Sequence, residues 1–333
     1  MSTEAERRWV YHQGEFVRAG ELRLSASVQA LHYGTGVFEG IRAYWDADAG
    51  VAHLLKGPEH YRRLHDSARL LRLDVTESVE ELVAITEELI RRNELRTDVY
   101  LRPLAYKLAL EPGTPFGVRL RGVSTALSIL ALPMGAYTRQ DGIRAGITSW
   151  RRVPDSSLPA RAKITGAYAN SALAVDEVTA AGYDDAIFLN QHGQVAEAST
   201  ANVFVVRDGR VATPSADADI LLGITRAAVR EILGRELALA TEERAVTRSE
   251  LYAADEVFIT GTGCEVVPVI ELDGRPIGDG AVGPVTAKVR DVYERAVRGA
   301  LPAYGHWLTP IPLGSAPAAP AAPGEQLARA AGR

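Results

Sequence analysis

The first 133 residues alternate apolar and polar positions in a way that predicts short strands and two helices. Polar residues ending at Gly50 separate two apolar runs, a pattern typical of strand, turn and strand. Pro58 suits the first turn of a helix, and Ser78 and Glu81 form a capping box that opens another. The predicted elements are strands over 37–45, 51–55, 99–107 and 124–132 and helices over 58–73 and from 79 onward.

Hairpins and longer helices are predicted for the rest of the chain. The polar segment 191–194 and the Asp208-Gly209 pair each separate two apolar runs, as hairpin turns do. The predicted elements are strands over 186–190 and 202–206 and from 195 and 211, and helices over 224–237 and 284–300. This order of elements predicts an α+β fold, with sheets of mixed sense and helices packed on them.

A break in the pattern predicts two domains. Pro133 and Gly135 interrupt the apolar run before them, and polar residues continue to Gly142. Alanine and proline dominate the end of the chain, which buries too little apolar surface to fold. The predicted division is a small N-terminal α/β domain over 1–133, a linker over 134–142, a large C-terminal domain over 143–313 and a disordered tail over 314–333.

Composition narrows the possible functions. The chain has 333 residues, of which 47% are hydrophobic, and this is enough for two domains with apolar cores. A net charge of −5 gives no electrostatic footprint for nucleic acid or an anionic membrane. A single cysteine, Cys264, excludes an internal disulfide and multi-cysteine metal sites, and no apolar run at the N-terminus resembles a signal peptide. We therefore expect a cytoplasmic protein without a metal site or membrane span.

Lys163 is the candidate reactive amine. The chain has only four lysines, and three of them, Lys56, Lys107 and Lys288, fit ordinary structural or surface positions. Lys163 differs because small residues surround it in the segment RAKITGAY at 161–168 and leave room for a bulky aldehyde. Arginine cannot replace it in this chemistry, since a guanidinium stays protonated.

Two further features complete a recognisable set. Gly223 to Arg226 opens the helix predicted from 224, where free N–H groups and the helix dipole favour an anion. An ordinary capped helix end is the alternative interpretation of this segment. Glu197 lies among small residues, so its carboxylate can approach a flat ring edge and keep a ring nitrogen protonated. An amine, an anion site and a carboxylate are what pyridoxal phosphate requires of a protein.

With these residues in place, the chain resembles the branched-chain amino acid aminotransferases among the fold type IV pyridoxal-phosphate enzymes. The resemblance runs from about Trp9 to Trp307 and implies a two-domain fold with the cofactor between the domains. It rests on several motifs in a fixed order. They are HYGTGVFEGIR at 32–42, RLHDSA at 63–68, YLRP at 100–103, KITGAY at 163–168, EASTANVF at 197–204, GITR at 223–226 and GTGCEVVPV at 261–269.

The resemblance implies a role for each cofactor-binding residue. Lys163 is the catalytic residue, which bonds covalently to the cofactor and then moves a proton at the substrate α-carbon. Glu197 pairs with the ring nitrogen, and Tyr168 forms a hydrogen bond with the ring's 3-oxygen. Arg63 binds the phosphate together with the helix start. The remaining residues implied to contact the cofactor are Leu222, Gly223, Ile224, Thr225 and Thr262.

The resemblance also implies a substrate pocket. Tyr100 meets the α-carboxylate with the N–H groups of Thr262 and Gly263, and Arg102 receives the distal carboxylate of glutamate. The expected reaction is transamination of L-leucine, L-isoleucine or L-valine with 2-oxoglutarate, which gives branched 2-oxo acids and L-glutamate. The side-chain pocket is implied to consist of Tyr33, Phe38, Gly40 and Tyr137.

Alternatives remain at this level. A D-amino acid or (R)-amine aminotransferase shares the fold, and more remote possibilities are an aminodeoxychorismate-lyase-like enzyme and a non-catalytic binder of pyridoxal phosphate. A dinucleotide site is weakened because Glu39 stands where the glycine fingerprint needs glycine. The family resemblance implies a homodimer or a larger homo-oligomer built from dimers, with amino acids and 2-oxo acids as the small-molecule partners.

Overall fold

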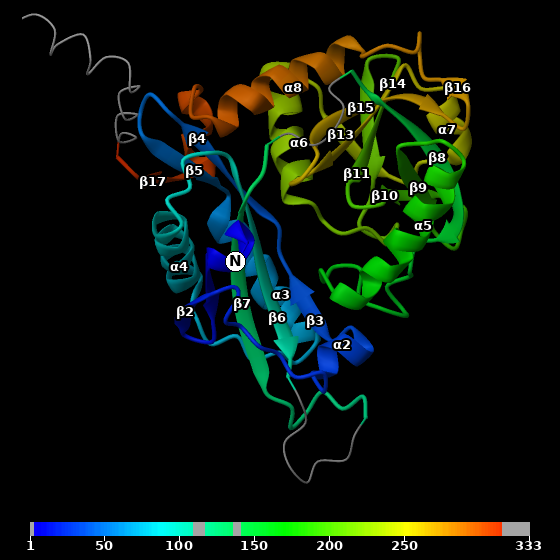
Figure 1. Ribbon diagram of the computed structural model, residues 1–333. Coiled ribbons are helices and arrows are strands. Elements are labelled where there is room, and N and C mark those ends of the chain that lie inside the picture. The colour runs from blue at the N-terminus through cyan, green and yellow to red at the C-terminus, as the bar shows by residue number, and fades with distance from the viewer. Residues whose placement is uncertain (1–2, 109–116, 136–140, 315–333) are drawn as a thin grey trace, which may run out of the picture.

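The computed structural model describes residues 3–108, 117–135 and 141–314, which form two β-sheets with helices packed around them (Figure 1). The first sheet is antiparallel throughout and follows the order β17-β5-β4-β6-β7-β1-β2, with β3 beside β6. Its strands are β1 Trp9–His12, β2 Glu15–Arg18, β3 Gly36–Phe38, β4 Ile41–Asp46, β5 Val51–Leu55, β6 Val99–Lys107, β7 Thr125–Pro133 and β17 Leu308–Pro312.

Two long helices cover the first sheet. Leu64 of the first and Leu82 and Ile90 of the second are buried against Ile41 and Leu101 of the strands. The Ser78–Glu81 capping box opens the second helix as predicted. The helices of this part are α1 Glu4–Arg7, α2 Gln29–Tyr33, α3 Gly57–Leu70 and α4 Val79–Arg92.

The second sheet closes on itself. It follows the order β10-β9-β8-β15-β14-β11-β12-β13 with β16 beside β15, and β10 also pairs with β11, so the strands from β10 to β11 form a ring. Its strands are β8 Ile143–Arg151, β9 Asp185–Leu189, β10 Val195–Ala198, β11 Asn202–Arg207, β12 Arg210–Pro214, β13 Thr241–Arg244, β14 Glu256–Gly261, β15 Glu265–Leu272 and β16 Arg275–Pro276.

Strand alternation divides the core of this second part. Val203 and Val257 belong to one apolar cluster, whereas their neighbours Phe204 and Phe258 belong to another, because successive side chains of a strand face opposite ways. The second cluster includes the buried faces of α6 and α8. The helices are α5 Tyr168–Ala180, α6 Ile224–Glu236, α7 Arg248–Tyr252 and α8 Pro284–Val297, with 3₁₀ turns η1 Thr165–Ala167 and η2 Pro302–Trp307.

Most predicted elements are confirmed within one to three residues at each end. The predicted strand 37–45 is divided into β3 and β4 at Glu39 and Gly40, and mixed strand sense holds for the second sheet but not the first. The final strand, β17, returns to the edge of the first sheet beside β5 (Figure 1). The two-domain division at 134–142 stays a prediction. No helix within the described ranges is long and apolar enough to cross a membrane.

Candidate active site

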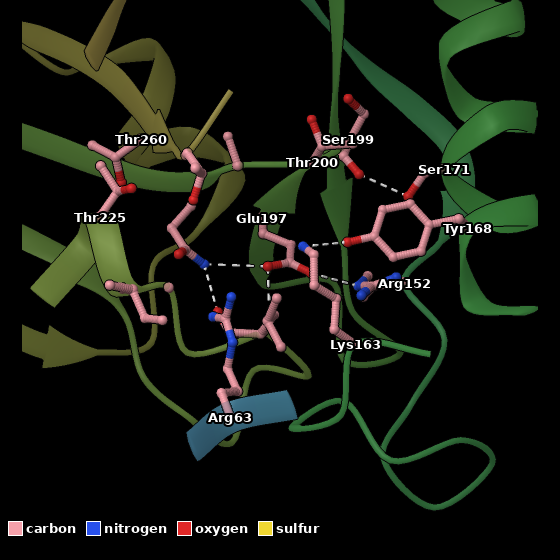
Figure 2. Close-up of a pocket in the computed structure, with 17 residues that line it drawn as sticks. Arg63, Arg152, Lys163, Tyr168, Ser171, Glu197, Ser199, Thr200, Thr225 and Thr260 are labelled. Carbon is pink, nitrogen blue, oxygen red and sulfur yellow. Dashed lines mark hydrogen bonds and ion pairs between the residues drawn. The ribbon is translucent and has the colours of Figure 1, made fainter. Parts of the chain in front are cut away.

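A pocket lies where the two parts of the molecule meet, and Figure 2 shows its side chains. α3 contributes Arg63, the segment before α5 contributes Lys163, and Tyr168 is the first residue of α5. β10 contributes Glu197, and the first turn of α6 contributes Thr225. Residues more than 160 positions apart in the sequence therefore face the same space.

Both ends of Lys163 are fixed. Its backbone N–H donates to the Ser67 hydroxyl at 3.1 Å, and its carbonyl accepts from the Phe38 N–H at 3.0 Å. At the other end, the Lys163 ammonium donates to the Tyr168 hydroxyl at 2.8 Å (Figure 2). The first sheet and α3 thus anchor the backbone, while α5 orients the amine.

Small residues near Lys163 serve backbone packing. Gly34 has a left-handed φ of 63°, and a Cβ there would lie 2.6 Å from the Gly166 Cα. Thr165 donates its hydroxyl proton toward the Gly34 and Gly36 carbonyls at 2.8 and 3.1 Å. From the sequence, we expected Gly166 to leave room for a cofactor. In the structure, the absence of a side chain at Gly166 allows its backbone to pack against the backbone of Gly34.

Glu197 is a buried carboxylate with several partners. Its Oε1 lies 2.8 Å from Arg152 Nε, and its Oε2 accepts from the Asn202 amide at 3.2 Å and from the Leu221 N–H at 3.1 Å. Burial raises the pKa of Glu197, and the Arg152 guanidinium opposes this shift, as does Lys163 more weakly. The carboxylate is consequently held in place for a cationic or N–H partner in the pocket.

Two of these partners were missed by the sequence interpretation. Asn202 pairs directly with Glu197 across the β10–β11 hairpin. The turn between two apolar runs is a local signal from which that pairing could have been found. Arg152 had no comparable signal, because it reaches Glu197 from the segment after β8 and the contact depends on the folded chain.

The start of α6 faces the pocket with Arg63 nearby. Gly223 is the N-cap residue and makes no side-chain cap, so the first N–H groups of the helix rely on other partners. Thr225 is buried and lines the pocket. Arg63 donates to the Leu222 carbonyl at 2.9 Å, which places its guanidinium beside this helix end. A helix N-terminus without a side-chain cap, next to a guanidinium, is the arrangement expected of an anion site.

The residues expected to contact substrate line an adjoining cavity of about 410 Å³. Tyr100, Arg102 and Phe38 lie together: Arg102 donates to the Tyr100 hydroxyl at 2.7 Å, and its guanidinium carbon lies 4.5 Å from the centre of the Phe38 ring. A Cβ at Gly40 would lie 2.2 Å from the Tyr100 hydroxyl, so only glycine leaves room for that tyrosine. The cavity also includes Lys163, Thr262 and Gly263.

One expected substrate residue, Tyr33, is not among the described residues that line this cavity. Tyr33 lies on α2, is 37% exposed and is absent from the described linings of both the pocket and the cavity. Tyr137 falls outside the described residues.

Glu265 anchors the loop that carries Thr262 and Gly263. It has a left-handed φ of 64° directly after that loop, which is uncommon for a residue with a side chain. Its carboxylate accepts from the Tyr44 hydroxyl at 2.8 Å and lies 3.7 Å from the buried Arg42 guanidinium. The loop of the second sheet is therefore tied to β4 of the first sheet.

These groups fit pyridoxal phosphate. Lys163 supplies an amine for the aldehyde, Glu197 a carboxylate for the ring nitrogen, and the α6 start an anion site. The buried hydroxyl of Thr260 in the same pocket has no hydrogen-bond partner among the described residues, which leaves it available to a bound group.

The chain is similar to known proteins over most of its length. The family model for amino-transferase class IV matches residues 36–272. The chain belongs to this family. A probable branched-chain-amino-acid aminotransferase of Aquifex aeolicus is 46% identical over 306 residues, which cover 91% of this chain and 96% of that relative.

Solved structures of class IV relatives have the same fold. The branched-chain aminotransferase of Thermoproteus uzoniensis, crystallised with norvaline, is 41% identical with a TM-score of 0.86 and covers 91% of this chain and 99% of its own. The T.th. branched-chain amino acid aminotransferase, complexed with N-(5'-phosphopyridoxyl)-L-glutamate, has the same identity and TM-score and covers 92% and 99%. The two-sheet arrangement described above is thus the fold type IV aminotransferase fold.

Proposed function

We propose that this protein uses pyridoxal phosphate to transfer the amino group of L-leucine, L-isoleucine or L-valine to 2-oxoglutarate, giving branched 2-oxo acids and L-glutamate. The observation that carries the proposal is the convergence of the Lys163 amine, the Glu197 carboxylate and the α6 start on one pocket. The names of the relatives support the choice of branched-chain substrates, and the phosphopyridoxyl-glutamate complex supports both the cofactor and glutamate.

When bound, pyridoxal phosphate supplies a carbonyl that takes up the amino group and a ring that accepts electrons. Lys163 would then act as the base that takes the proton from the α-carbon of the amino donor in one half-reaction, and as the acid that gives a proton to the α-carbon of the new glutamate in the other. Tyr168 hydrogen-bonds this amine in the structure and is proposed to orient it. Glu197 holds a proton on the ring nitrogen, and Arg152 and Asn202 keep that carboxylate in position.

The phosphate is proposed to bind at the start of α6. Gly223, Ile224 and Thr225 offer backbone N–H groups there, and the Thr225 hydroxyl is nearby. Arg63 supplies the positive charge, and Leu222 positions Arg63 through its carbonyl. Thr262 is proposed to contact both cofactor and substrate, since it lines the pocket and the adjoining cavity.

Substrate recognition is proposed to use the cavity next to Lys163. Tyr100 and the N–H groups of Thr262 and Gly263 bind the α-carboxylate, while Phe38 and Gly40 face an aliphatic side chain. Arg102 lies within the same aromatic wall and receives the distal carboxylate of glutamate. The pocket then accepts an apolar and an acidic side chain in alternate half-reactions. Tyr33 and Tyr137 remain proposed parts of the side-chain pocket.

A homodimer, or a larger assembly of dimers, is proposed for the active form. Support comes from large apolar side chains that are exposed, among them Leu24, Leu31, Tyr33 and Val118. Gln29 donates to the Gly117 and Arg119 carbonyls, so Val118 lies near α2. Light scattering after size exclusion tests this proposal. A cytoplasmic location is also proposed, supported by the presence of a single, buried cysteine.

The experiment for the proposed reaction follows glutamate formation from 2-oxoglutarate with each candidate donor in turn. L-Leucine, L-isoleucine and L-valine are expected to be good donors. D-Alanine and (R)-1-phenylethylamine are expected to react at least about a hundredfold more slowly, a difference of roughly 2.7 kcal/mol in transition-state free energy. Preference for the D-amino acid or the amine would assign the chain to a different specificity within the fold.

A further inference from the structure

Glu39 lies at the centre of a buried ionic cluster that the proposed reaction does not use. It stands between Phe38 and Gly40, and its side chain is completely buried. Arg63 donates to it twice, from Nε to Oε1 at 2.7 Å and from Nη2 to Oε2 at 2.9 Å. The His60 Nδ1 also lies 2.7 Å from Oε2. The Glu39 carboxylate therefore accepts hydrogen bonds from both nitrogens along one edge of the Arg63 guanidinium.

These contacts determine which N–H groups of Arg63 remain available. A guanidinium has five N–H donors in a rigid plane. Nε and one N–H of Nη2 point to Glu39, and one N–H of Nη1 points to the Leu222 carbonyl. Among the described residues, no acceptor is recorded for the second N–H of either terminal nitrogen. Nη1 lies beside the α6 start, because it donates to the carbonyl of Leu222, which directly precedes the N-cap residue Gly223, and Nη2 is bonded to the same guanidinium carbon.

The negative charge of Glu39 and its hydrogen bonds to Arg63 have opposite effects on phosphate binding. Burial alone would raise the pKa of Glu39, but the Arg63 guanidinium and the hydrogen bonds from Arg63 and His60 hold it well below its usual range. Burial lowers the pKa of His60, which leaves a paired carboxylate and guanidinium with a neutral imidazole. The Glu39 charge therefore cancels much of the positive charge that Arg63 offers to an anion. On charge alone, Glu39 would weaken phosphate binding.

We propose that Glu39 is a positioning residue for the cofactor phosphate: it fixes the Arg63 plane so that the two remaining N–H groups serve the anion site at the α6 start. Two hydrogen bonds along one edge of the guanidinium restrict its rotation. A donor that is already oriented loses little conformational entropy when the anion binds. The inference rests on the proposed function, because it assumes that the anion is the phosphate of pyridoxal phosphate.

The test compares two ligands that differ only in the phosphate. Dissociation constants of pyridoxal phosphate and of pyridoxal are measured by absorption titration for the wild type and E39Q, after each protein is shown to unfold cooperatively. Glutamine keeps the size of the side chain but accepts through only one oxygen. We expect E39Q to bind pyridoxal phosphate at least about tenfold more weakly, roughly 1.4 kcal/mol, and pyridoxal within about twofold of the wild type.

A matched control is E271Q, which removes the carboxylate from the exposed Arg144–Glu271 pair on the second sheet. It should leave both dissociation constants unchanged. Unchanged or tighter binding of pyridoxal phosphate by E39Q would overturn the inference, since that is the result expected if Glu39 acts only through its charge. If the wild type itself does not prefer pyridoxal phosphate to pyridoxal, the proposed phosphate site fails, irrespective of Glu39.

R63K provides a second route, and E39D replaces E39Q in these comparisons if E39Q does not fold, because it keeps the charge but shortens the side chain. Lysine keeps the positive charge but lacks the rigid fork, so R63K should lose the preference for the phosphorylated ligand at least as far as E39Q does. In the double variant E39Q/R63K, the loss should be no greater than in R63K alone, because Glu39 acts through Arg63. A wild-type preference in R63K, or additive losses in the double variant, would contradict the positioning role.

Discussion

At the scale of single residues, the pocket depends on side chains whose partners are fixed before any ligand binds. Lys163 is the clearest example, since Ser67 and Phe38 hold its backbone and Tyr168 holds its amine. Lys163 was identifiable from the sequence because the chain has few lysines and this one lies among small residues. Its supporting residues were not all identifiable, since Ser67 lies 96 positions away and contacts it only after folding.

Tyr168→Phe removes the hydroxyl that orients the Lys163 amine. We expect the variant to fold and to bind pyridoxal phosphate, but kcat for leucine transamination should fall about ten- to a hundredfold. This range corresponds to a lost hydrogen bond to a charged group, roughly 1.5–3 kcal/mol. Steady-state kinetics with saturating cofactor check the result. A kcat within twofold of the wild type would remove Tyr168 from the proposed mechanism.

Cys264 lines the cavity beside Lys163, yet it is only 8% exposed and burial raises the pKa of its thiol to about 12. Because thiol reagents attack the thiolate, we expect almost no modification of the native protein at pH 8. One thiol per chain should react after denaturation, since the sequence has a single cysteine. Titration with a chromogenic disulfide reagent measures both numbers. Rapid stoichiometric labelling of the folded protein would show that the loop at 262–264 opens.

At the scale of elements, the proposed phosphate site and the buried Glu197 carboxylate are coupled through the start of α6. A Cβ at Gly223 would lie 2.0 Å from the side-chain oxygen of Asn202. The amide of that asparagine donates to Glu197 and to the Leu221 carbonyl. The helix end, the β10–β11 hairpin and the buried carboxylate therefore form one packed unit.

Gly223→Ala should disturb this unit by displacing Asn202. We expect cofactor affinity to fall at least about tenfold, because both Glu197 and the segment before α6 lose a partner. Gly234→Ala is the matched control on the same helix, where an added Cβ meets nothing within 4 Å. It should keep cofactor affinity and raise the free energy of unfolding by about 0.5–1 kcal/mol. Equal affinities in the two variants would contradict the coupling.

The elements that could be predicted are those with a long periodic pattern or a local cap. α4 begins at its capping box, and α6 and α8 carry apolar residues at helical spacing. The β1–β2 hairpin was not predicted, because each strand has only four residues. β17 was not predicted either: it contains Pro310 and Pro312, which are tolerated at the edge of a sheet but obscure a strand pattern.

At the scale of the whole molecule, side-chain hydrogen bonds and the Arg42–Glu265 ion pair connect its two parts. Arg63 of α3 contacts both Glu39 and the segment before α6, while Glu265 of β15 contacts Tyr44 of β4. Such cross-connections cannot be obtained from local patterns, because each joins residues that are far apart in the sequence. The sequence interpretation accordingly identified Arg63 but gave Glu39 no individual role beyond weakening a dinucleotide fingerprint.

The acid stability of the protein should depend on Glu39. Its folded-state pKa lies below its ordinary value of 4.5, so the ionised form favours the folded protein. This stabilisation is fully present above pH 4.5 and is lost as the pH falls further. We expect the gap in unfolding free energy between the wild type and E39Q to shrink below pH 4.5 by up to about 1.4 kcal/mol per pH unit. Urea unfolding from pH 3 to pH 7 measures it, and a constant gap would contradict the assignment.

The most direct test of the central claim is the absorption spectrum of the protein with pyridoxal phosphate, recorded before and after L-leucine is added without an amino acceptor. The account predicts that the visible band of the bound cofactor disappears with leucine and returns with 2-oxoglutarate, and that Lys163→Ala abolishes both changes. No visible band in the wild type, or wild-type spectral changes in Lys163→Ala, would contradict the account.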